Sequence, residues 1–321
     1  MRDATSRLSG RAAEKIWLNS YPPAVAAEIA PFAHSSLGSL FQSSCATYGD
    51  RLAFSSMGRG MTFRELEAQS RKVGAWLQAK GLVKGDRVAV MTPNILQNPV
   101  AVYGILRAGF TVVNVNPLYT PRELQHQLVD AGAKAIIVLE NFAGTVQQVL
   151  PNTPVKHVIV ATMGDMLGLK GHIVNFVVRK VKKLVPAWSI PGHTSFKKVL
   201  AEGARQALKP VDVTASDIAF LQYTGGTTGV SKGATLTHAN LLANKQQIAM
   251  WLEAAFELKG RPEVMTFICA LPLYHIFALT VNSLMGIATG SHNVLIANPR
   301  DIPAFVKELQ NHKAHIFPGL N

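Results

Sequence analysis

The most informative part of the chain reads Tyr223-Thr224-Gly225-Gly226-Thr227-Thr228-Gly229-Val230-Ser231-Lys232-Gly233, with four glycines, three threonines and one lysine in eleven residues. Glycine lets backbone amides come close to an anion and accepts positive φ angles. Consecutive amides form a concave nest of donors, and the threonine hydroxyls and the lysine ammonium add further donors. This composition predicts a loop that holds a triphosphate, with an ordinary flexible Gly/Thr loop as the competing interpretation.

Two well-characterised phosphate loops do not fit this spacing. A Walker A loop needs Gly-Lys followed by Ser or Thr, whereas here Ser231 precedes Lys232 and Gly233 follows it. The dinucleotide fingerprint needs the spacing Gly-x-Gly-x-x-Gly, which residues 225–229 lack. The predicted phosphate site is therefore of a different kind.

Apolar runs surround this loop. Residues 218–223 and 233–236 predict strands before and after it, and Thr237 is placed to cap a helix that reaches about residue 256. The C-terminal series continues with predicted strands at 264–270, 293–296 and 314–317 and predicted helices at 275–289 and 302–312.

The N-terminal half shows the same alternation of apolar runs and helical patterns. Capping boxes begin helices at Thr62 and Thr120, and Gly81 and Gly132 are placed to end them. Continuous β-branched runs separated by helices indicate parallel strands covered on both faces, so we expect an α/β fold with doubly wound, mostly parallel sheets flanked by helices. The expected strands are residues 87–91, 111–115, 135–139 and 157–161, and a further helix is expected at 99–106.

Glycine, proline and lysine collect between residues 165 and 212 and indicate a boundary. We expect a first α/β subdomain at residues 1–165, a basic connecting segment at 166–212 and a second α/β subdomain with the phosphate loop at 213–321. Chains normally end in an exposed tail or a docked helix, whereas this one stops just past a predicted core strand. We therefore expect a truncated chain whose second subdomain is incomplete at its C-terminal end.

The composition narrows the class of protein. Of the 321 residues, 48% are hydrophobic and 16% are charged, which excludes a disordered chain. The net charge of +13 favours anionic partners, but we expect no nucleic acid because no recognition motif or series of stacking aromatics is present. Two cysteines, Cys45 and Cys269, exclude a disulfide framework and favour reduced thiols in the cytoplasm. The sequence contains no uninterrupted run of about 18 apolar residues, so we expect no transmembrane helix.

Part of the connecting segment combines apolar and basic residues at helical spacing. Seven Lys or Arg residues, and no Asp or Glu, lie between residues 170 and 198. A helix over residues 172–185 has two interpretations: peripheral contact with the inner face of the cell membrane, or packing on the protein with a solvated basic face. The expected apolar face consists of Ile173, Val174, Val177, Val178, Val181 and Leu184, and the basic face of Arg179, Lys180, Lys182 and Lys183.

Residues 223–233 resemble the phosphate-binding signature of the adenylate-forming superfamily, which includes acyl-CoA synthetases, adenylation domains and firefly luciferases. The similarity runs from about Trp17 to Asn321 and identifies the chain as the N-terminal part of such an enzyme. Three further stretches are similar to bacterial long-chain fatty-acid–CoA ligases in particular: residues 114–124 (NVNPLYTPREL), 271–279 (LPLYHIFAL) and 298–303 (NPRDIP).

The chain departs from the superfamily in two ways. Many members have proline where this sequence has Ser231, which changes the local rigidity of the loop but removes no phosphate donor. Members are also longer, and their second part carries a Tyr-Gly-x-Thr-Glu motif, an aspartate for the ribose hydroxyls and a small domain with a catalytic lysine. That part has no counterpart here, which puts turnover by this chain in question.

The resemblance implies a two-step reaction on a long-chain fatty acid. ATP first converts the acid to acyl-AMP with release of pyrophosphate, and coenzyme A then displaces AMP to give acyl-CoA, with Mg²⁺ as the metal. Two alternatives stay open: activation of an aryl or shorter-chain acid, and a truncated, non-catalytic remnant that binds nucleotide or lipid. The sequence does not determine the oligomeric state. A homodimer is one expected form.

The resemblance also implies roles for residues around the nucleotide. Thr227, Thr228 and Lys232 are the expected catalytic residues, and Thr224 is expected to position magnesium together with the ATP phosphates. The competing interpretation of Lys232 is a solvated loop lysine. The expected nucleotide-binding residues are Tyr223, Thr224, Gly225, Gly226, Thr227, Thr228, Gly229, Val230, Ser231, Lys232, Gly233 and Ala234.

Two residues are expected to contact the fatty acid. His275 is implied to lie beside the acyl carboxylate, with a helix cap or a packed core residue as the competing interpretation. Trp251 is expected to line or gate an apolar tunnel, with an ordinary core or surface aromatic as the alternative. Val281, Leu284 and Met285 are candidates for an acyl channel, although such spacing is equally typical of helix core.

Overall fold

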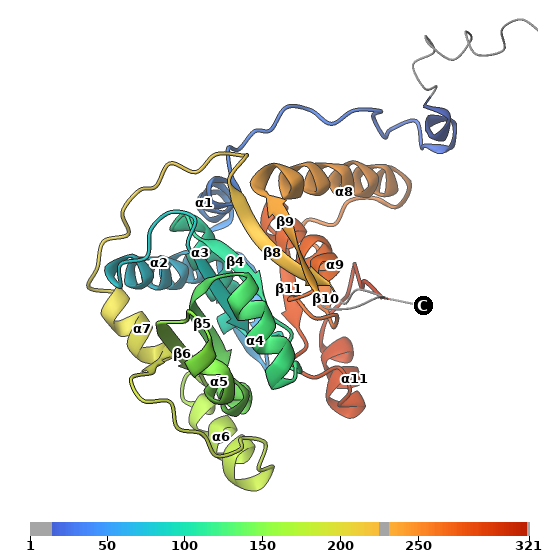
Figure 1. The fold of residues 1–321 in the computed structure, drawn as a ribbon. Helices are drawn as coiled ribbons and strands as arrows, with labels where there is room; N and C mark the ends of the chain where they lie inside the picture. The colour runs from blue at the N-terminus through green and yellow to red at the C-terminus, as the bar shows by residue number, and fades with distance from the viewer. Residues whose placement is uncertain (1–14, 225–230, 320–321) are drawn as a thin grey trace, which may run out of the picture.

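Two β-sheets organise the computed structural model, which describes residues 15–224 and 231–319 (Figure 1). In the larger sheet every neighbouring pair of strands is parallel except the last pair, which forms an antiparallel hairpin. In order across this sheet the strands are β7 (Thr194–Ser195), β6 (His157–Ala161), β5 (Ala133–Leu139), β3 (Arg87–Met91), β4 (Thr111–Asn114), β8 (Ile218–Thr224) and β9 (Lys232–Thr237).

The smaller sheet combines strands from the N-terminal and C-terminal parts of the chain. Its parallel neighbours are β10 (Thr266–Cys269), β11 (His292–Leu295) and β1 (Leu52–Ser56), and β2 (Arg59–Thr62) pairs antiparallel to β1. Both sheets therefore contain strands from before and after residues 166–212. The division of the chain into two subdomains at that segment stays a prediction.

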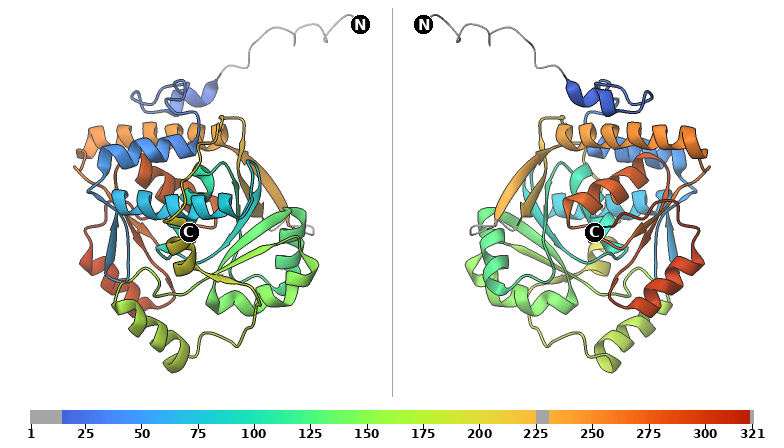
Figure 2. Two further views of the ribbon diagram at one scale, coloured as in Figure 1. Left: turned by 90° about the vertical axis from the view of Figure 1, so that its left-hand side faces the viewer. Right: turned by 90° about the vertical axis from the view of Figure 1, so that its right-hand side faces the viewer.

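Helices cover both faces of the larger sheet, as Figures 1 and 2 show. Val88 and Val90 of β3 belong to the main core, which also contains side chains of α1, α2 and α3 and of the smaller sheet. Ala89 and Met91, the alternate residues of the same strand, pack with α4 and α5 in a second core. The helices are α1 (Leu37–Tyr48), α2 (Phe63–Ala79), α3 (Gln97–Arg107), α4 (Pro121–Asp130), α5 (Ala143–Val149), α6 (Lys170–Phe176), α7 (Phe196–Gly203), α8 (His238–Lys259), α9 (Ile276–Ala278), α10 (Met285–Ala288) and α11 (Ile302–Asn311).

The expected α/β fold with mostly parallel sheets is confirmed, and so are its strongest local signals. The side chains of Thr62, Thr120 and Thr237 each accept a hydrogen bond from the backbone three residues on, completing capping boxes at the starts of α2, α4 and α8. Gly81 and Gly132 have φ angles of +86° and +59° just past α2 and α4, where a side chain would strain the turn.

Three local expectations are corrected. The segment predicted as one helix over 275–289 consists of α9, a π-helical turn (Leu279–Leu284) and α10. The strand predicted at 314–317 is reduced to a single bridge between Ile316 and Phe267. The helix predicted over 172–185 consists of α6 and a π-helical turn (Val177–Val181), and it ends before residue 182. Among the described residues, no helix is long and apolar enough to cross a membrane.

Acid should destabilise the chain through His238. This imidazole is 2% exposed, and its Nδ1 accepts a hydrogen bond from the Leu37 backbone N–H, 3.0 Å away, at the start of α1. Burial lowers the pKa of His238 to about 4, from an ordinary value of 6.5. The unfolded chain therefore binds the proton first, and stability falls as the pH drops from about 6.5 towards 4, by about 2 kcal/mol between pH 7 and pH 5.

Urea unfolding at pH 7 and pH 5 checks this prediction. His238→Asn keeps a side-chain acceptor for the Leu37 amide but cannot titrate, so its loss of stability on acidification should be smaller by about 2 kcal/mol. Burial also lowers the pKa of His292 to about 4, so the variant should retain part of the pH dependence. An identical pH dependence in both proteins would contradict the assignment to His238.

Candidate active site

The predicted phosphate loop is carried by the antiparallel hairpin of β8 and β9. Thr224 at the end of β8 pairs with Lys232 at the start of β9, and both side chains are exposed. Residues 225–230, which include Gly225, Gly226, Thr227, Thr228, Gly229 and Val230, lie outside the described part of the chain. The hairpin therefore places the two ends of the loop, and the roles of all these residues stay predictions.

Packing within the protein explains why tyrosine and glycine occupy positions 223 and 233 of the signature. The Tyr223 hydroxyl donates a hydrogen bond to Asp130 Oδ2 of α4 at 2.5 Å, and burial together with this contact raises the pKa of the phenol. Gly233 pairs with Tyr223 across the hairpin, and a Cβ atom there would lie 2.9 Å from the tyrosine ring. Glycine is required at this position by a close approach of side chain to backbone, independently of any bound phosphate.

A second hydrogen bond joins the hairpin to α4. His126 Nε2 lies 2.9 Å from the Ser231 carbonyl oxygen, just before β9 begins. Ser231 is partly buried, and Ala234 is exposed on β9. Together with the Tyr223–Asp130 contact, this hydrogen bond fixes both strands of the hairpin against α4.

His275 lies in the loop between β10 and α9, and this loop is bonded to the strand that leads into the phosphate loop. Gln222 of β8 is 5% exposed, and its Nε2 donates to the Tyr274 carbonyl oxygen at 2.7 Å. Its Oε1 accepts from Asn114 Nδ2 at 3.1 Å, on the neighbouring strand β4. The peptide group before His275 is therefore held at a fixed position relative to β8, while the imidazole itself is exposed.

Asn94 holds the first part of the same loop. It lies three residues after β3 and is 3% exposed. Its Nδ2 donates to the carbonyl oxygens of Cys269 and Leu271, both at 2.8 Å, and its Oδ1 accepts from the Leu273 amide at 2.9 Å. One buried side chain thus satisfies three backbone groups of a segment nearly 180 residues away in sequence.

Sequence reasoning did not identify Asn94, Asn114 or Gln222. A signal was present, because Asn114 and Gln222 interrupt apolar strands, and a buried amide needs partners. The partners themselves come from distant segments, so the pattern alone does not say which loop they hold.

A cavity of about 410 Å³ opens at the carboxyl ends of the parallel strands. Ligands of open α/β sheets commonly bind in such a crevice. Asn94 follows β3, Leu118 follows β4, Tyr274 follows β10 and Arg300 follows β11, and all four line the cavity. The loop that carries His275 therefore forms part of the cavity wall.

The remaining predicted substrate residues lie elsewhere. Trp251 of α8 is 45% exposed and meets the ring of Tyr21 edge-on, with 5.1 Å between ring centroids. Its expected place beside an acyl chain stays a prediction. Leu284 and Met285 are buried in the main core, as ordinary helix packing requires, and Val281 is partly buried.

The described residues contain no group of three or more His, Cys, Asp or Glu side chains that could hold a metal ion. A magnesium ion here would depend mainly on phosphate oxygens, with a hydroxyl such as that of Thr224 as an additional ligand. Cys45 and Cys269 are both buried and unpaired, and burial raises the pKa of each thiol, which makes them poor nucleophiles.

Comparisons with known proteins agree closely with one another. Residues 41–321 match the family described as AMP-binding enzyme. A long-chain-fatty-acid–CoA ligase of Salmonella typhimurium is 53% identical over 310 residues, covering 96% of this chain and 54% of that protein. A Bacillus subtilis protein of the same name is 34% identical over 308 residues, covering 95% of this chain and 54% of that protein. The chain thus spans about half the length of the curated relatives it matches.

Solved structures show the same fold. The anthranilate CoA ligase AuaEII, in complex with anthranoyl-AMP, superposes with a TM-score of 0.72 at 20% identity, covering 90% of this chain and 50% of that one. A long-chain-fatty-acid-CoA ligase from Archaeoglobus fulgidus gives a TM-score of 0.68 at 23% identity, covering 88% of this chain and 51% of that one.

Proposed function

Because the chain belongs to the AMP-binding enzyme family, we propose that it supplies the N-terminal part of the active site of a long-chain fatty-acid–CoA ligase. Its fold is that of the adenylate-forming enzymes, and relatives about half identical to it carry the ligase name. Since the chain spans about half of their length, the complete reaction, its substrates and its partners are proposals for this chain.

The proposed reaction has two steps. A fatty-acid carboxylate oxygen attacks the α-phosphorus of ATP, the bond to the β-phosphate breaks, and acyl-AMP and pyrophosphate form. The thiol sulfur of coenzyme A then attacks the acyl carbonyl carbon, its proton is lost to solvent, and AMP leaves. Both steps depend on positioning and on stabilisation of developing charge more than on covalent help from the protein.

The proposed roles follow the hairpin and its loop. The amides of Gly225, Gly226 and Gly229 and the hydroxyls of Thr227 and Thr228 hold the β- and γ-phosphates. Lys232 places its charge on the leaving pyrophosphate, and Thr224 helps to hold Mg²⁺, which neutralises phosphate charge when bound. Tyr223, Val230, Ser231, Gly233 and Ala234 are the other proposed nucleotide-binding residues.

The observation that supports this proposal best is the hydrogen bond that Gln222 donates to the loop between β10 and α9. Its hydrogen bond to the Tyr274 carbonyl joins the strand that enters the phosphate loop to the loop that carries His275. Nucleotide phosphates at the first loop and an acyl carboxylate at the second would then be presented to each other by one rigid unit. We propose that His275 lies beside that carboxylate and that Trp251 lines the path of the apolar chain.

The test measures the exchange of labelled pyrophosphate into ATP by the purified chain, with magnesium, and its dependence on an added carboxylic acid. Exchange with oleate that exceeds exchange with decanoate and benzoate supports a long-chain ligase, and the reverse order indicates another acid. No exchange from a chain that circular dichroism shows to be folded would favour the alternative, a binding remnant without turnover. The half-length match to relatives is the observation that favours this alternative.

We propose a cytoplasmic location with peripheral contact at the inner face of the cell membrane through residues 172–185. The two unpaired, buried cysteines support a reducing compartment. A homodimer is the proposed assembly if the chain associates, and size-exclusion chromatography with light scattering tests it.

A further inference from the structure

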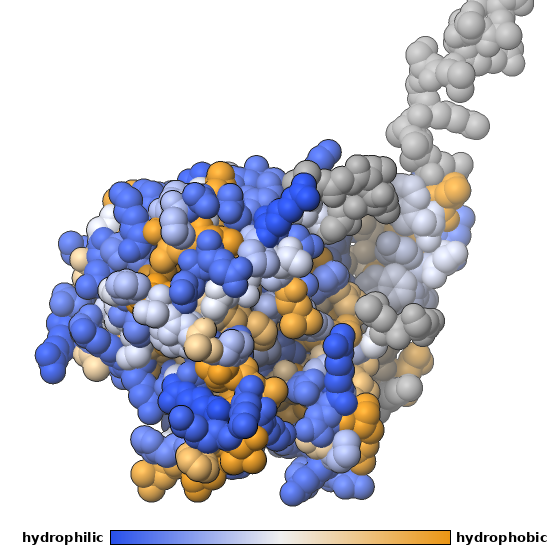
Figure 3. Space-filling view, turned by 60° about the horizontal axis from the view of Figure 1, so that its bottom comes forward, coloured by the Kyte–Doolittle hydropathy of each residue, from blue (hydrophilic) through white to orange (hydrophobic). Residues whose placement is uncertain are grey.

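A set of large apolar side chains is exposed on the segment from Leu169 to Leu184, which contains α6 and the π-helical turn after it. Figure 3 looks at the face of the molecule to which α6 belongs, where apolar and hydrophilic residues lie side by side. The exposed apolar side chains are Leu169 (89% exposed), Phe176 (61%), Ile173 (67%), Val181 (64%) and Leu184 (54%).

The structure divides the predicted apolar face in two. Val178 is buried, and Val174 and Val177 are partly buried, so these three side chains turn towards the protein. Leu169, Ile173 and Phe176 recur at a helical spacing of four and three residues, and they are left on the outside. One set of apolar side chains therefore packs on the protein, and a second set is exposed on the outer side of the segment.

Basic side chains accompany this stripe. Lys180, Lys182 and Lys183 are exposed, and Lys182 lines the same groove as Ile173 and Leu184. We call the five exposed apolar residues and these three lysines the basic–apolar face. The acidic residues among those that line the groove are Asp301, just before α11, and Glu308 of α11.

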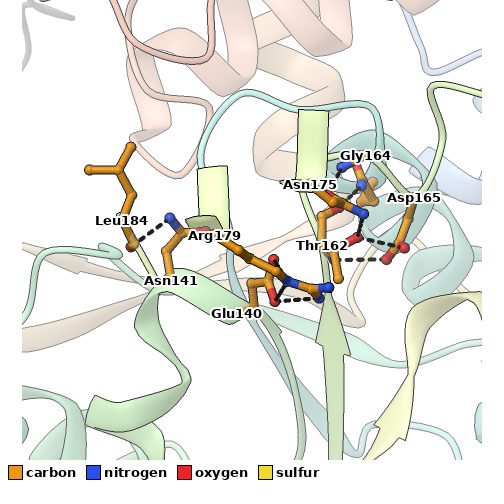
Figure 4. A network of polar contacts seen from close by, with 9 residues as sticks. Glu140, Asn141, Thr162, Gly164, Asp165, Asn175, Arg179 and Leu184 are labelled. Atoms are coloured by element: carbon orange, nitrogen blue, oxygen red, sulfur yellow. Dashed lines mark hydrogen bonds and ion pairs between the residues drawn. The ribbon is translucent and has the colours of Figure 1, made fainter. Parts of the chain in front are cut away.

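Polar contacts hold the basic–apolar face in place (Figure 4). Arg179 makes a bidentate ion pair with Glu140, whose side chain is 2% exposed, with Nη2–Oε2 at 2.6 Å and Nε–Oε1 at 3.1 Å. Asn141 Nδ2 donates to the Leu184 carbonyl oxygen at 3.0 Å. Arg179 is therefore a structural cation, and the exposed apolar residues belong to a fixed surface, not to a frayed segment.

The start of the segment is held equally firmly. Asn175 Oδ1 accepts from the Gly164 amide at 2.7 Å, and its Nδ2 donates to Thr162 Oγ1 at 2.9 Å. Gly164 and Gly171 approach each other so closely that a Cβ atom on either would lie about 2 Å from the carbonyl oxygen of the other. A side chain at either glycine would displace α6 from its seat.

A groove of about 340 Å³ lies between part of the basic–apolar face and the cavity of the candidate active site. Its lining is mostly apolar and includes Ile173, Val177 and Phe305. It shares Met163, Ile296, Ala297 and Asn298 with the cavity at the carboxyl ends of the strands. The groove and that cavity are therefore immediate neighbours.

We propose that the basic–apolar face is a preformed docking surface for an anionic lipid bilayer. Its lysines pair with lipid phosphates, and its exposed apolar side chains enter the boundary between headgroups and acyl chains. The proposal gives the location proposed above a definite contact surface. It does not require turnover, because binding to vesicles is measured without ATP, so its failure and that of the proposed reaction are distinguishable.

Co-sedimentation with vesicles tests this proposal on the 321-residue chain. Vesicles of phosphatidylcholine with phosphatidylglycerol should bind the chain, and vesicles of phosphatidylcholine alone should bind it far less. Lys182→Glu/Lys183→Glu should weaken binding to the anionic vesicles by on the order of 10²-fold, since each cation near such a surface contributes strongly. Added salt should weaken binding of the wild type.

A matched control separates docking from general attraction of a basic protein. Lys156→Glu/Lys209→Glu makes the same change in net charge at two exposed lysines, one before β6 and one after α7. This control should bind as the wild type does. Ile173→Ser/Phe176→Ser leaves every charge in place and should weaken binding by about tenfold or more, because apolar area no longer enters the bilayer.

Circular dichroism confirms that each variant is folded before binding is compared. The proposal is overturned if the folded wild type does not bind anionic vesicles, or if both lysine pairs reduce binding equally. It is also overturned if Lys182→Glu/Lys183→Glu binds as the wild type does. Binding that depends on the lysines but is unaffected by Ile173→Ser/Phe176→Ser overturns the apolar insertion.

Discussion

Replacing Thr227 and Thr228 with alanine should reduce oleate-dependent exchange of pyrophosphate into ATP by on the order of 10²-fold for each hydroxyl removed. In the proposed reaction, negative charge shifts onto the β- and γ-phosphates as the bond to the α-phosphate breaks. Hydroxyl donors that are already positioned at those oxygens stabilise the transition state without reorganisation. The rate of exchange at saturating ATP measures this loss directly.

Thr235→Ala is the matched control for this prediction. Thr235 is an exposed threonine of β9, on the same hairpin but past the phosphate loop, so removing its hydroxyl should leave exchange unchanged. Exchange that survives in Thr227→Ala/Thr228→Ala would contradict the proposed role of the loop. An equal loss in Thr235→Ala would show that the hairpin, and not the two hydroxyls, is sensitive to substitution.

Asn94→Leu should lower the free energy of unfolding by about 3 kcal/mol, because three backbone groups lose their partner in a buried loop. The carbonyl oxygens of Cys269 and Leu271 would lose a donor, and the Leu273 amide would lose an acceptor. Leucine is branched at Cγ as asparagine is, so the change removes the hydrogen bonds and keeps a branched side chain at this position. Urea unfolding at neutral pH measures the effect.

Asn152→Leu provides the corresponding control at an exposed asparagine and should change the free energy of unfolding by less than about 0.5 kcal/mol. Asn94→Leu should also reduce exchange, since Asn94 positions the loop that carries His275 without touching the reacting atoms. If the two variants are equally stable, the hydrogen bonds of Asn94 do not hold this loop.

Local signals in the sequence predicted much of the fold. The capping boxes at Thr62, Thr120 and Thr237 and the buried strands β3 and β6 depend on residues close together in the chain. The π-helical turn before α10 and the single bridge at Ile316 could not be predicted in this way. They depend on how distant elements pack, which overrides the local pattern.

The candidate site was only partly predictable for the same reason. Composition indicated a phosphate loop at residues 223–233, and resemblance indicated the loop of His275. Gln222 joins these two loops and Asn94 holds the second of them, and their partners lie 52 and up to 179 residues away. A sequence pattern reports that a strand contains a polar residue, but only the fold identifies the backbone group that it satisfies.

Equilibrium binding of ATP with magnesium, measured by titration calorimetry, examines the phosphate loop without requiring turnover. The 321-residue chain should bind ATP saturably, and Thr227→Ala/Thr228→Ala should bind it more weakly by on the order of 10²-fold, because two hydrogen bonds to a charged phosphate are lost. Equal affinity in the two proteins, or no binding by a wild-type chain that is folded, would contradict the assignment of residues 223–233 as the nucleotide site.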